Sequence, residues 1–536
     1  MQKIPIFLLF GLFLTPSFTY CLMFSTETMS EEYFYASYLG GSGYDVIRDM
    51  VLNSAGEMIL VGTTFSTDFP IQDAYQPTYA GGVRPEEPPI YGGDGFITMI
   101  SNTGEIVWST FHGGSMLDFC ERVVTVGDEI IIAGVTNSQD LTIIDGDDQV
   151  SYNGGQSDVF VAVYSIVGEL LRSVYLGGSG AELIEDIVIN HEGELLLVGF
   201  TESNDLPVTM DAYQDNIRGE ADGFLVKMDP SNLDVLYLSY FGGSGRDGIG
   251  NIALNPTGGF YISGYTDSGD FPLTDNAFQS SIVGSERDTF LTLFSDELQL
   301  EYSTYLGGSA MEDCFDLAVD SLGSAILSGR TWSDDFPTIN AFQPQYSNIE
   351  VDGFYTKFSP DGESLEFSSY LGYSGWDTLN RLCITEDDDI VLAGMADTSD
   401  FPVVNGFQES KHEGTDIYIL MLDSDGNHIF ASYLGGNGME LPWGCINQGS
   451  KLYLVAQTTS SNMITSSDAL MNIYAGDTDG YFFTLDLEEY LDALEQNEES
   501  DEGSSNISSY WASYYIVTIL SVCIFAGWYI YNRNRN

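Results

Sequence analysis

The chain has 536 residues, of which 80 are Asp or Glu and 16 are Lys or Arg, so its formal net charge at pH 7 is -64. Phosphate binding needs clustered cations, and this balance therefore excludes nucleic acid as a partner. A hydrophobic content of 43% with 13% aromatic residues predicts a well-filled core, because disordered acidic chains have few aromatic residues.

Residues 1–22 have the order of a secretory signal peptide. Lys3 precedes an apolar run over 4–14, and Thr15-Pro16-Ser17 follows it. We therefore exclude this segment from the expected fold.

A glycine-rich stretch, Tyr38-Leu39-Gly40-Gly41-Ser42-Gly43, returns six more times along the chain. The first glycines of these stretches are Gly40, Gly113, Gly177, Gly242, Gly307, Gly372 and Gly435, and a second glycine follows each of them except Gly372, which Tyr373 follows. A unit of about 65 residues is therefore repeated seven times, and such a period decides the fold class before any other signal.

Each unit contains four short strand patterns. In the unit that begins at Gly242, they lie at 247–254, 260–265, 289–295 and 298–306. Seven such units predict an all-β fold, a seven-bladed β-propeller with four antiparallel strands per blade. Residues 33–39 match a fourth strand without the three before it, and the last unit ends after its third strand, so the N-terminal strand is expected to close the ring over 33–487.

Three motifs recur in fixed order: Tyr-Leu-Gly-Gly-Ser-Gly, Thr-x-Ser-x-Asp-Phe-Pro and Asp-Gly-Phe. In this order and spacing they resemble the SBBP family of seven-bladed β-propeller repeats found in secreted and surface proteins. The resemblance covers residues 33–487 and implies the fold and an extracellular setting. It transfers no catalytic residue, because the family has no agreed ones. The seventh unit departs most, with Ala456 in place of a glycine and Pro442-Trp443 in its first strand.

A carboxylate stands five residues after the first glycine of every stretch. If the strand that follows is innermost, these side chains form a ring at the mouth of the central channel, where a cation such as Ca²⁺ would bind. The alternative, which we favour, is that each carboxylate caps its own glycine turn. The seven residues are Asp45, Asp118, Glu182, Asp247, Glu312, Asp377 and Glu440.

The first unit carries an insertion over 81–91 that is rich in proline. Arg84, Pro85 and Tyr91 in it are candidate contacts for a protein or glycan partner, although an incidental surface insertion explains the segment as well. Asn506 is a candidate glycosylation site in the sequon Asn506-Ile507-Ser508.

Four cysteines lie within the repeats. Cys120 and Cys314 fall in distant units and are expected not to pair. Cys383 and Cys445 fall in neighbouring units and could pair, but we expect buried free thiols.

The C-terminal residues predict a membrane anchor. Residues 488–510 are acidic and serine-rich, as in a flexible stalk, and 511–531 hold no charge over a length that spans a bilayer. Arg533 and Arg535 in the tail, 532–536, place the C-terminus in the cytoplasm and the propeller outside the cell.

The sequence holds no nucleophile elbow, phosphate loop or zinc motif, and its four histidines are dispersed. We therefore expect a non-catalytic surface module that binds protein or glycan partners, with calcium as the cation it would use. The alternative is a surface hydrolase that uses carboxylates at the channel mouth.

Overall fold

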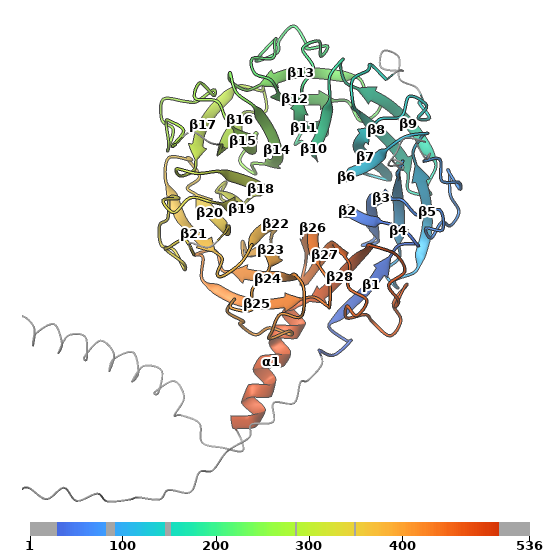
Figure 1. Cartoon of the computed structure of the whole chain (residues 1–536), viewed down its shortest axis with the longest axis vertical. Helices are drawn as coiled ribbons and strands as arrows, with labels where there is room; N and C mark the ends of the chain where they lie inside the picture. The colour runs from blue at the N-terminus through green and yellow to red at the C-terminus, as the bar shows by residue number, and fades with distance from the viewer. Residues whose placement is uncertain (1–28, 82–91, 145–151, 285–286, 348–349, 503–536) are drawn as a thin grey trace, which may run out of the picture.

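Twenty-eight strands form seven four-stranded antiparallel sheets in the computed structural model, which describes residues 29–81, 92–144, 152–284, 287–347 and 350–502. Figure 1 shows the sheets as blades around a common centre, with the first strand of each blade innermost. The all-β prediction of a seven-bladed β-propeller with four strands per blade is confirmed.

The strands of the first four blades, in chain order, are β2 (Asp45–Leu52), β3 (Met58–Thr64), β4 (Asp94–Ile100) and β5 (Ile106–His112); β6 (Asp118–Val126), β7 (Glu129–Thr136), β8 (Asp158–Ser165) and β9 (Leu170–Leu176); β10 (Glu182–Ile189), β11 (Leu195–Thr201), β12 (Asp222–Met228) and β13 (Val235–Phe241); β14 (Asp247–Leu254), β15 (Phe260–Thr266), β16 (Asp288–Phe294) and β17 (Leu300–Leu306). Those of the last three are β18 (Glu312–Val319), β19 (Ala325–Thr331), β20 (Asp352–Phe358) and β21 (Leu365–Leu371); β22 (Thr378–Ile384), β23 (Ile390–Ala396), β24 (Asp416–Leu422) and β25 (His428–Leu434); and β26 (Glu440–Gln448), β27 (Lys451–Thr458) and β28 (Asp479–Asp486) with β1 (Phe34–Leu39).

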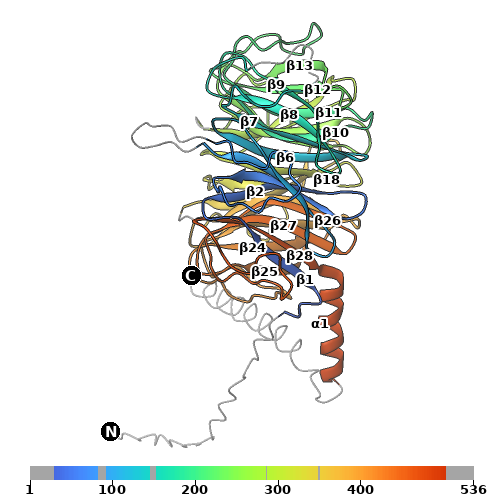
Figure 2. The same ribbon diagram turned by 90° about the vertical axis from the view of Figure 1, so that its right-hand side faces the viewer.

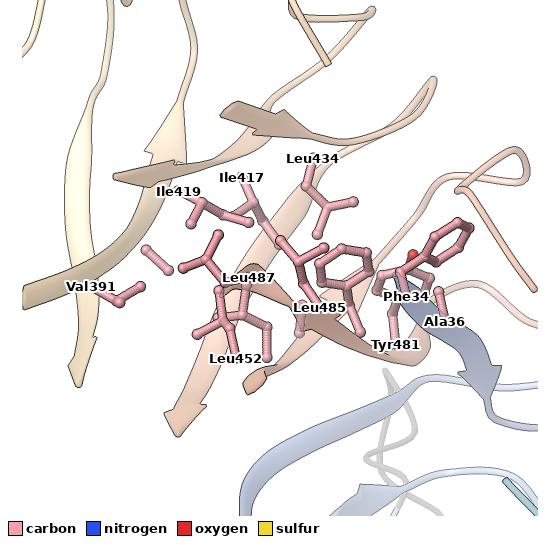
Figure 3. Close-up of a cluster of buried hydrophobic side chains, with 14 of the residues drawn as sticks. Phe34, Ala36, Val391, Ile417, Ile419, Leu434, Leu452, Tyr481, Leu485 and Leu487 are labelled. Carbon is pink, nitrogen blue, oxygen red and sulfur yellow. The ribbon is translucent and has the colours of Figure 1, made fainter. Parts of the chain in front are cut away.

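The N-terminal strand closes the ring, as predicted. β1 pairs with β28 from Phe34 opposite Leu485 to Leu39 opposite Gly480. Figure 3 shows Phe34 and Ala36 of β1 beside Tyr481 of β28 in a cluster of buried apolar side chains. Residues more than 400 positions apart therefore form one blade.

The repeated glycines are required by close packing and not by an unusual backbone angle. The glycine pair of the first unit is absent from the glycines with positive φ. A Cβ atom on Gly41 would lie 2.6 Å from the Cβ of Ser66 and 2.7 Å from Oδ1 of Asp68. Asp68 belongs to the Asp-Phe-Pro motif and accepts a hydrogen bond from the Ser42 amide at 2.9 Å, so the two motifs meet on one face of the disc.

A helix, α1 (Leu487–Glu502), begins where the flexible stalk was expected. Leu487 and Tyr490 are buried, and Leu491 and Leu494 pack on the same cluster, so an apolar stripe at helical spacing holds the helix on blades six and seven. Figures 1 and 2 show α1 starting at the rim of the disc beside β28 and projecting away from it. No helix in the described ranges is long and apolar enough to cross a membrane.

Several predicted features lie outside the described residues. These are the signal peptide 1–22, the membrane span 511–531 with its tail, the insertion residues Arg84, Pro85 and Tyr91, and the glycosylation site Asn506.

Cys383 and Cys445 form a disulfide, so the expectation of free thiols at this pair is wrong. Their Cα atoms lie 5.8 Å apart because the innermost strands of blades six and seven, β22 and β26, run side by side. Cys120 and Cys314 are buried free thiols, as expected.

We expect replacement of both Cys383 and Cys445 by serine to lower the free energy of unfolding by about 4 kcal/mol, because the bridge closes a loop of 62 residues. Urea denaturation checks this value. A reducing agent should lower the stability of the unaltered protein equally and leave the double variant unchanged. An equal loss in both proteins would contradict a role for this bridge.

Candidate functional site

The innermost strands of all seven blades share one irregularity. In each, the pairing register slips by one residue, as between Ile47 and Asp49 of β2 or Ile184 and Asp186 of β10. The skipped residue is a β-bulge, which redirects a side chain out of the regular alternation of a strand. Both the bulged residue and the one after it therefore reach the centre of the ring.

These two positions vary more among the blades than the turns around them do, although the second is Asp in three blades and Arg in two. The bulged residues are Arg48, Glu121, Glu185, Gly250, Phe315, Asn380 and Trp443, and the residues that follow them are Asp49, Arg122, Asp186, Asn251, Asp316, Arg381 and Gly444. A site specific to this protein is therefore expected here, where the repeat does not dictate the side chain.

Two contiguous cavities occupy the channel. The larger, of 360 Å³, is lined by Arg48, Arg122 and Arg381 among others. The second, of 270 Å³, is lined by Arg287 and Arg330 and shares several lining residues with the first. Five of the 16 basic residues of a chain with 80 acidic ones thus surround one channel.

The arginines stack on aromatic rings. The guanidinium of Arg48 lies 4.1 Å from the ring centre of Trp443, and that of Arg287 lies 4.2 Å from the ring centre of Tyr265. Stacking of this kind fixes the plane of the guanidinium and leaves its N–H edges available for a ligand.

Some of these N–H donors have no partner. Nε of Arg48 and Nε of Arg287 are buried without a hydrogen bond in the described structure, and buried polar groups of this kind are rare. Arg48 lies 3.8 Å from the carboxylate of Glu121, whereas Arg287 and Arg330 share Asp313 at 3.0 and 2.8 Å. The Nε atoms themselves face carboxylates beyond hydrogen-bond distance, at 3.8 Å from Glu121 for Arg48 and at 3.6 Å from Asp267 for Arg287, so a closer anionic oxygen would complete their hydrogen bonds.

A narrower cavity of 140 Å³, lined by Asp49, Asp186 and Asp316, adjoins the larger one. Each aspartate accepts the backbone amide of a residue in the next blade, as Asp49 does from Val123 at 2.9 Å. Burial raises the pKa of Asp49 and Asp316 to about 6 against the lowering effect of Arg122 and Arg381 respectively. These aspartates therefore link neighbouring blades through hydrogen bonds to backbone amides.

The seven carboxylates predicted to form a ring or to cap their glycine turns stand at or directly before the start of the innermost strands and bind those turns. Each is buried in its own blade and accepts a backbone amide of its own glycine turn, and in six blades threonine and serine hydroxyl groups as well. Asp45, for example, accepts from Gly41 N at 2.6 Å and from Ser66 Oγ at 2.7 Å. The structure does not gather the seven at the channel mouth, and the described residues contain no group of three or more His, Cys, Asp or Glu side chains placed to hold a metal ion. These carboxylates are Asp45, Asp118, Glu182, Asp247, Glu312, Asp377 and Glu440.

Sequence reasoning missed the channel arginines. Arg48, Arg122 and Arg381 stand eight or nine residues after the first glycine of a unit, where the units disagree and no motif marks them. The signal that could have found them is the scarcity of arginine, combined with its return at two adjacent positions of the repeat.

No family model matches the chain, and no curated protein matches its sequence. The SBBP assignment therefore remains a resemblance, although the propeller that it implied is present. Among solved structures, the chain is similar to a polysaccharide lyase of family PL25, an ulvan lyase, with 9% identity, a TM-score of 0.42 and coverage of 79% of this chain and 92% of that one.

Two further solved structures show the same level of similarity. A putative 6-phosphogluconolactonase from Bacteroides fragilis has 11% identity and a TM-score of 0.35, with coverage of 75% of this chain and 94% of that one. Acylaminoacyl peptidase from Pyrococcus horikoshii has 12% identity and a TM-score of 0.35, with coverage of 81% and 50%. The prediction that this chain is not an enzyme is corrected here, because these solved propellers are enzymes; none of their activities is assigned to this chain.

Proposed function

We propose that the channel is the active site of an enzyme that binds and cleaves an anionic saccharide. The observation that carries this proposal is the set of five arginines around the two cavities, with vacant buried donors on Arg48 and Arg287. Four of the five arginines already face carboxylates, but the Nε donors of Arg48 and Arg287 make no hydrogen bond, so a ligand that supplies carboxylate or sulfate oxygens to them would stabilise the site.

The remaining lining residues favour a saccharide over other anions. The rings of Trp443 and Phe315 and the amide of Asn380 also line the larger cavity, so apolar and amide groups lie beside the arginines. This combination suits rings that carry hydroxyl groups as well as an acid group. The larger cavity, of 360 Å³, is within the range of about 300–1,000 Å³ that is typical of ligand sites, and the adjoining cavity adds 270 Å³ less the part they share.

Replacement of Arg48 or Arg287 by glutamine should weaken binding of uronate oligosaccharides about 10-fold to 100-fold each, because each variant loses a charge-assisted hydrogen bond. Isothermal titration calorimetry with uronate, sulfated and neutral oligosaccharides measures the effect. Release of new chain ends from the same compounds measures cleavage.

Arg172 provides a matched control, because its Nε is also buried without a hydrogen bond but it pairs with Glu129 on the second blade and lines neither cavity. Arg172→Gln should leave binding unchanged. Equal loss of binding in this variant, or equal binding of neutral and acidic saccharides, would refute the proposal.

A further inference from the structure

Glu185 occupies a distinctive place in the channel. It is the bulged residue of β10, where the register slips between Ile184 and Asp186. It lines both the 360 Å³ and the 270 Å³ cavities, so it lies where the two meet. A ligand that extends from one cavity into the other therefore passes its carboxylate.

The other acids of the channel are held in place. Three form ion pairs with arginine: Glu121 with Arg48 at 3.8 Å, Asp186 with Arg122 at 3.5 Å, and Asp313 with Arg330 at 2.8 Å. Three accept a backbone amide of the next blade: Asp49 from Val123 at 2.9 Å, Asp186 from Ile252 at 2.9 Å, and Asp316 from Leu382 at 2.8 Å. Within the described residues, Glu185 makes neither a hydrogen bond nor an ion pair. Its carboxylate is the one left available to a substrate.

We propose that Glu185 is the proton-transfer residue of this channel and that the reaction is a β-elimination beside a uronate carboxylate. This inference rests on the proposed function and assigns its chemistry. The Glu185 carboxylate takes the proton on the carbon that bears the carboxylate. The electron pair of that C–H bond forms a carbon–carbon double bond, the adjacent C–O glycosidic bond breaks, and the leaving oxygen takes the proton back from Glu185. No water, oxidant or reductant is consumed.

The number of available carboxylates favours elimination over hydrolysis. Glycoside hydrolysis with two carboxylates gives each a separate role. In the described channel only Glu185 lacks a partner, whereas Arg48, Arg122 and Arg381 line the same cavity. Cations facing the substrate carboxylate stabilise the negative charge that develops on it when the proton leaves, and such stabilisation is a large contribution to catalysis.

The charges around Glu185 suit a group that takes and returns one proton. Burial raises the pKa of Glu185 to about 7, with Arg122 of β6 and Arg381 of β22 lowering it and Glu121 and Asp186 raising it. A pKa close to the working pH is the optimum for such a group.

The experiment uses the full chain with polygalacturonate, alginate and a sulfated glucuronate polysaccharide as probes. We expect cleavage of at least one probe to give ultraviolet-absorbing unsaturated ends in the same number as new reducing ends. Glu185→Gln should lower turnover about 100-fold to 10,000-fold and leave the dissociation constant within about threefold. Glu301→Gln, at an exposed position of β17, serves as the control and should keep full turnover.

The outcomes are separable. Reducing ends without unsaturated ends would overturn elimination, and turnover retained in Glu185→Gln with unchanged melting temperature would overturn the role of Glu185. Binding that persists without any cleavage would also overturn this inference while leaving the anionic site in place. Failure of all three probes to bind would overturn the proposed function and this inference with it.

Discussion

A chain that begins at residue 44 and so lacks β1 should fail to form a cooperative native state at 25 °C. β1 buries Phe34, Tyr38 and Leu39, which contribute about 1.5–3 kcal/mol each. The Tyr38 hydroxyl also donates to Ser460 O and accepts from Met463 N, both at 2.9 Å. Together these terms approach the 5–15 kcal/mol that stabilises a typical domain, so blade seven would open and expose the edge of β28.

Circular dichroism and size-exclusion chromatography of the truncated chain measure this loss. A synthetic peptide of residues 29–43 should restore the native spectrum when it is added during refolding, since β1 joins its sheet only through β28. The same peptide with Tyr38→Ala is the control and should not restore it. A truncated chain that melts cooperatively near the melting temperature of the full chain would show that closure by β1 is dispensable.

The fold could be predicted from the sequence because the repeat carries most of its information. Seven glycine stretches about 65 residues apart predict seven blades, and the unmatched strand at 33–39 predicts the closure. The reason why these positions require glycine could not be predicted from the sequence. Ser66 and Asp68, which lie more than 20 residues further along the chain, leave no room for a Cβ atom on Gly41. Contacts of this kind are invisible without coordinates.

The candidate site could not be predicted for a related reason. A β-bulge leaves no sequence mark, so the alternation of β10 predicts only one of Glu185 and Asp186 on the channel side, whereas the structure places both there. Helix α1 was likewise not predicted, because its few apolar residues lie in an acidic segment. Leu491 and Leu494 indicate a buried helical face only once their contacts with the blades are known.

Buried pairs of carboxylates at the blade junctions should make the protein more stable in mild acid than at neutral pH. At one junction, Oε2 of Glu312 and Oδ1 of Asp288 lie 2.6 and 2.8 Å from the position that a Cβ on Gly307 would occupy. Both side chains are fully buried, and Oδ1 of Asp288 has no hydrogen-bond partner in the described structure. Burial, with the neighbouring negative charge of Glu312 as a smaller cause, raises the pKa of Asp288 to about 7, and burial raises that of Glu312 to about 7.

The direction of the pH effect follows from these shifts. The unfolded carboxyl groups titrate at about 4, so between about pH 4 and pH 7 the folded protein holds protons that the unfolded chain has released. These two groups therefore contribute most to the free energy of unfolding below about pH 4 to 5. Their contribution should fall as the pH rises through 7. Urea denaturation at constant ionic strength from pH 4 to pH 8 measures this trend, and constant or rising stability over that range would contradict it.

Asp288→Asn should remove part of the pH dependence of the free energy of unfolding. The asparagine oxygen can still accept from Gln279, as Oδ2 of Asp288 does at 2.8 Å, while the new amide N–H₂ faces Glu312 and donates to it. We expect the variant to be more stable than the unaltered protein by about 1–2 kcal/mol at pH 8 and equally stable at pH 4, where Asp288 is already protonated. Asp352→Asn is the matched control at another junction: Oδ1 of Asp352 already accepts from Ser347 Oγ, so the substitution should bring no gain at pH 8. Equal effects of both variants at both pH values would show that the missing hydrogen bond of Asp288 and the neighbouring charge of Glu312 do not limit stability.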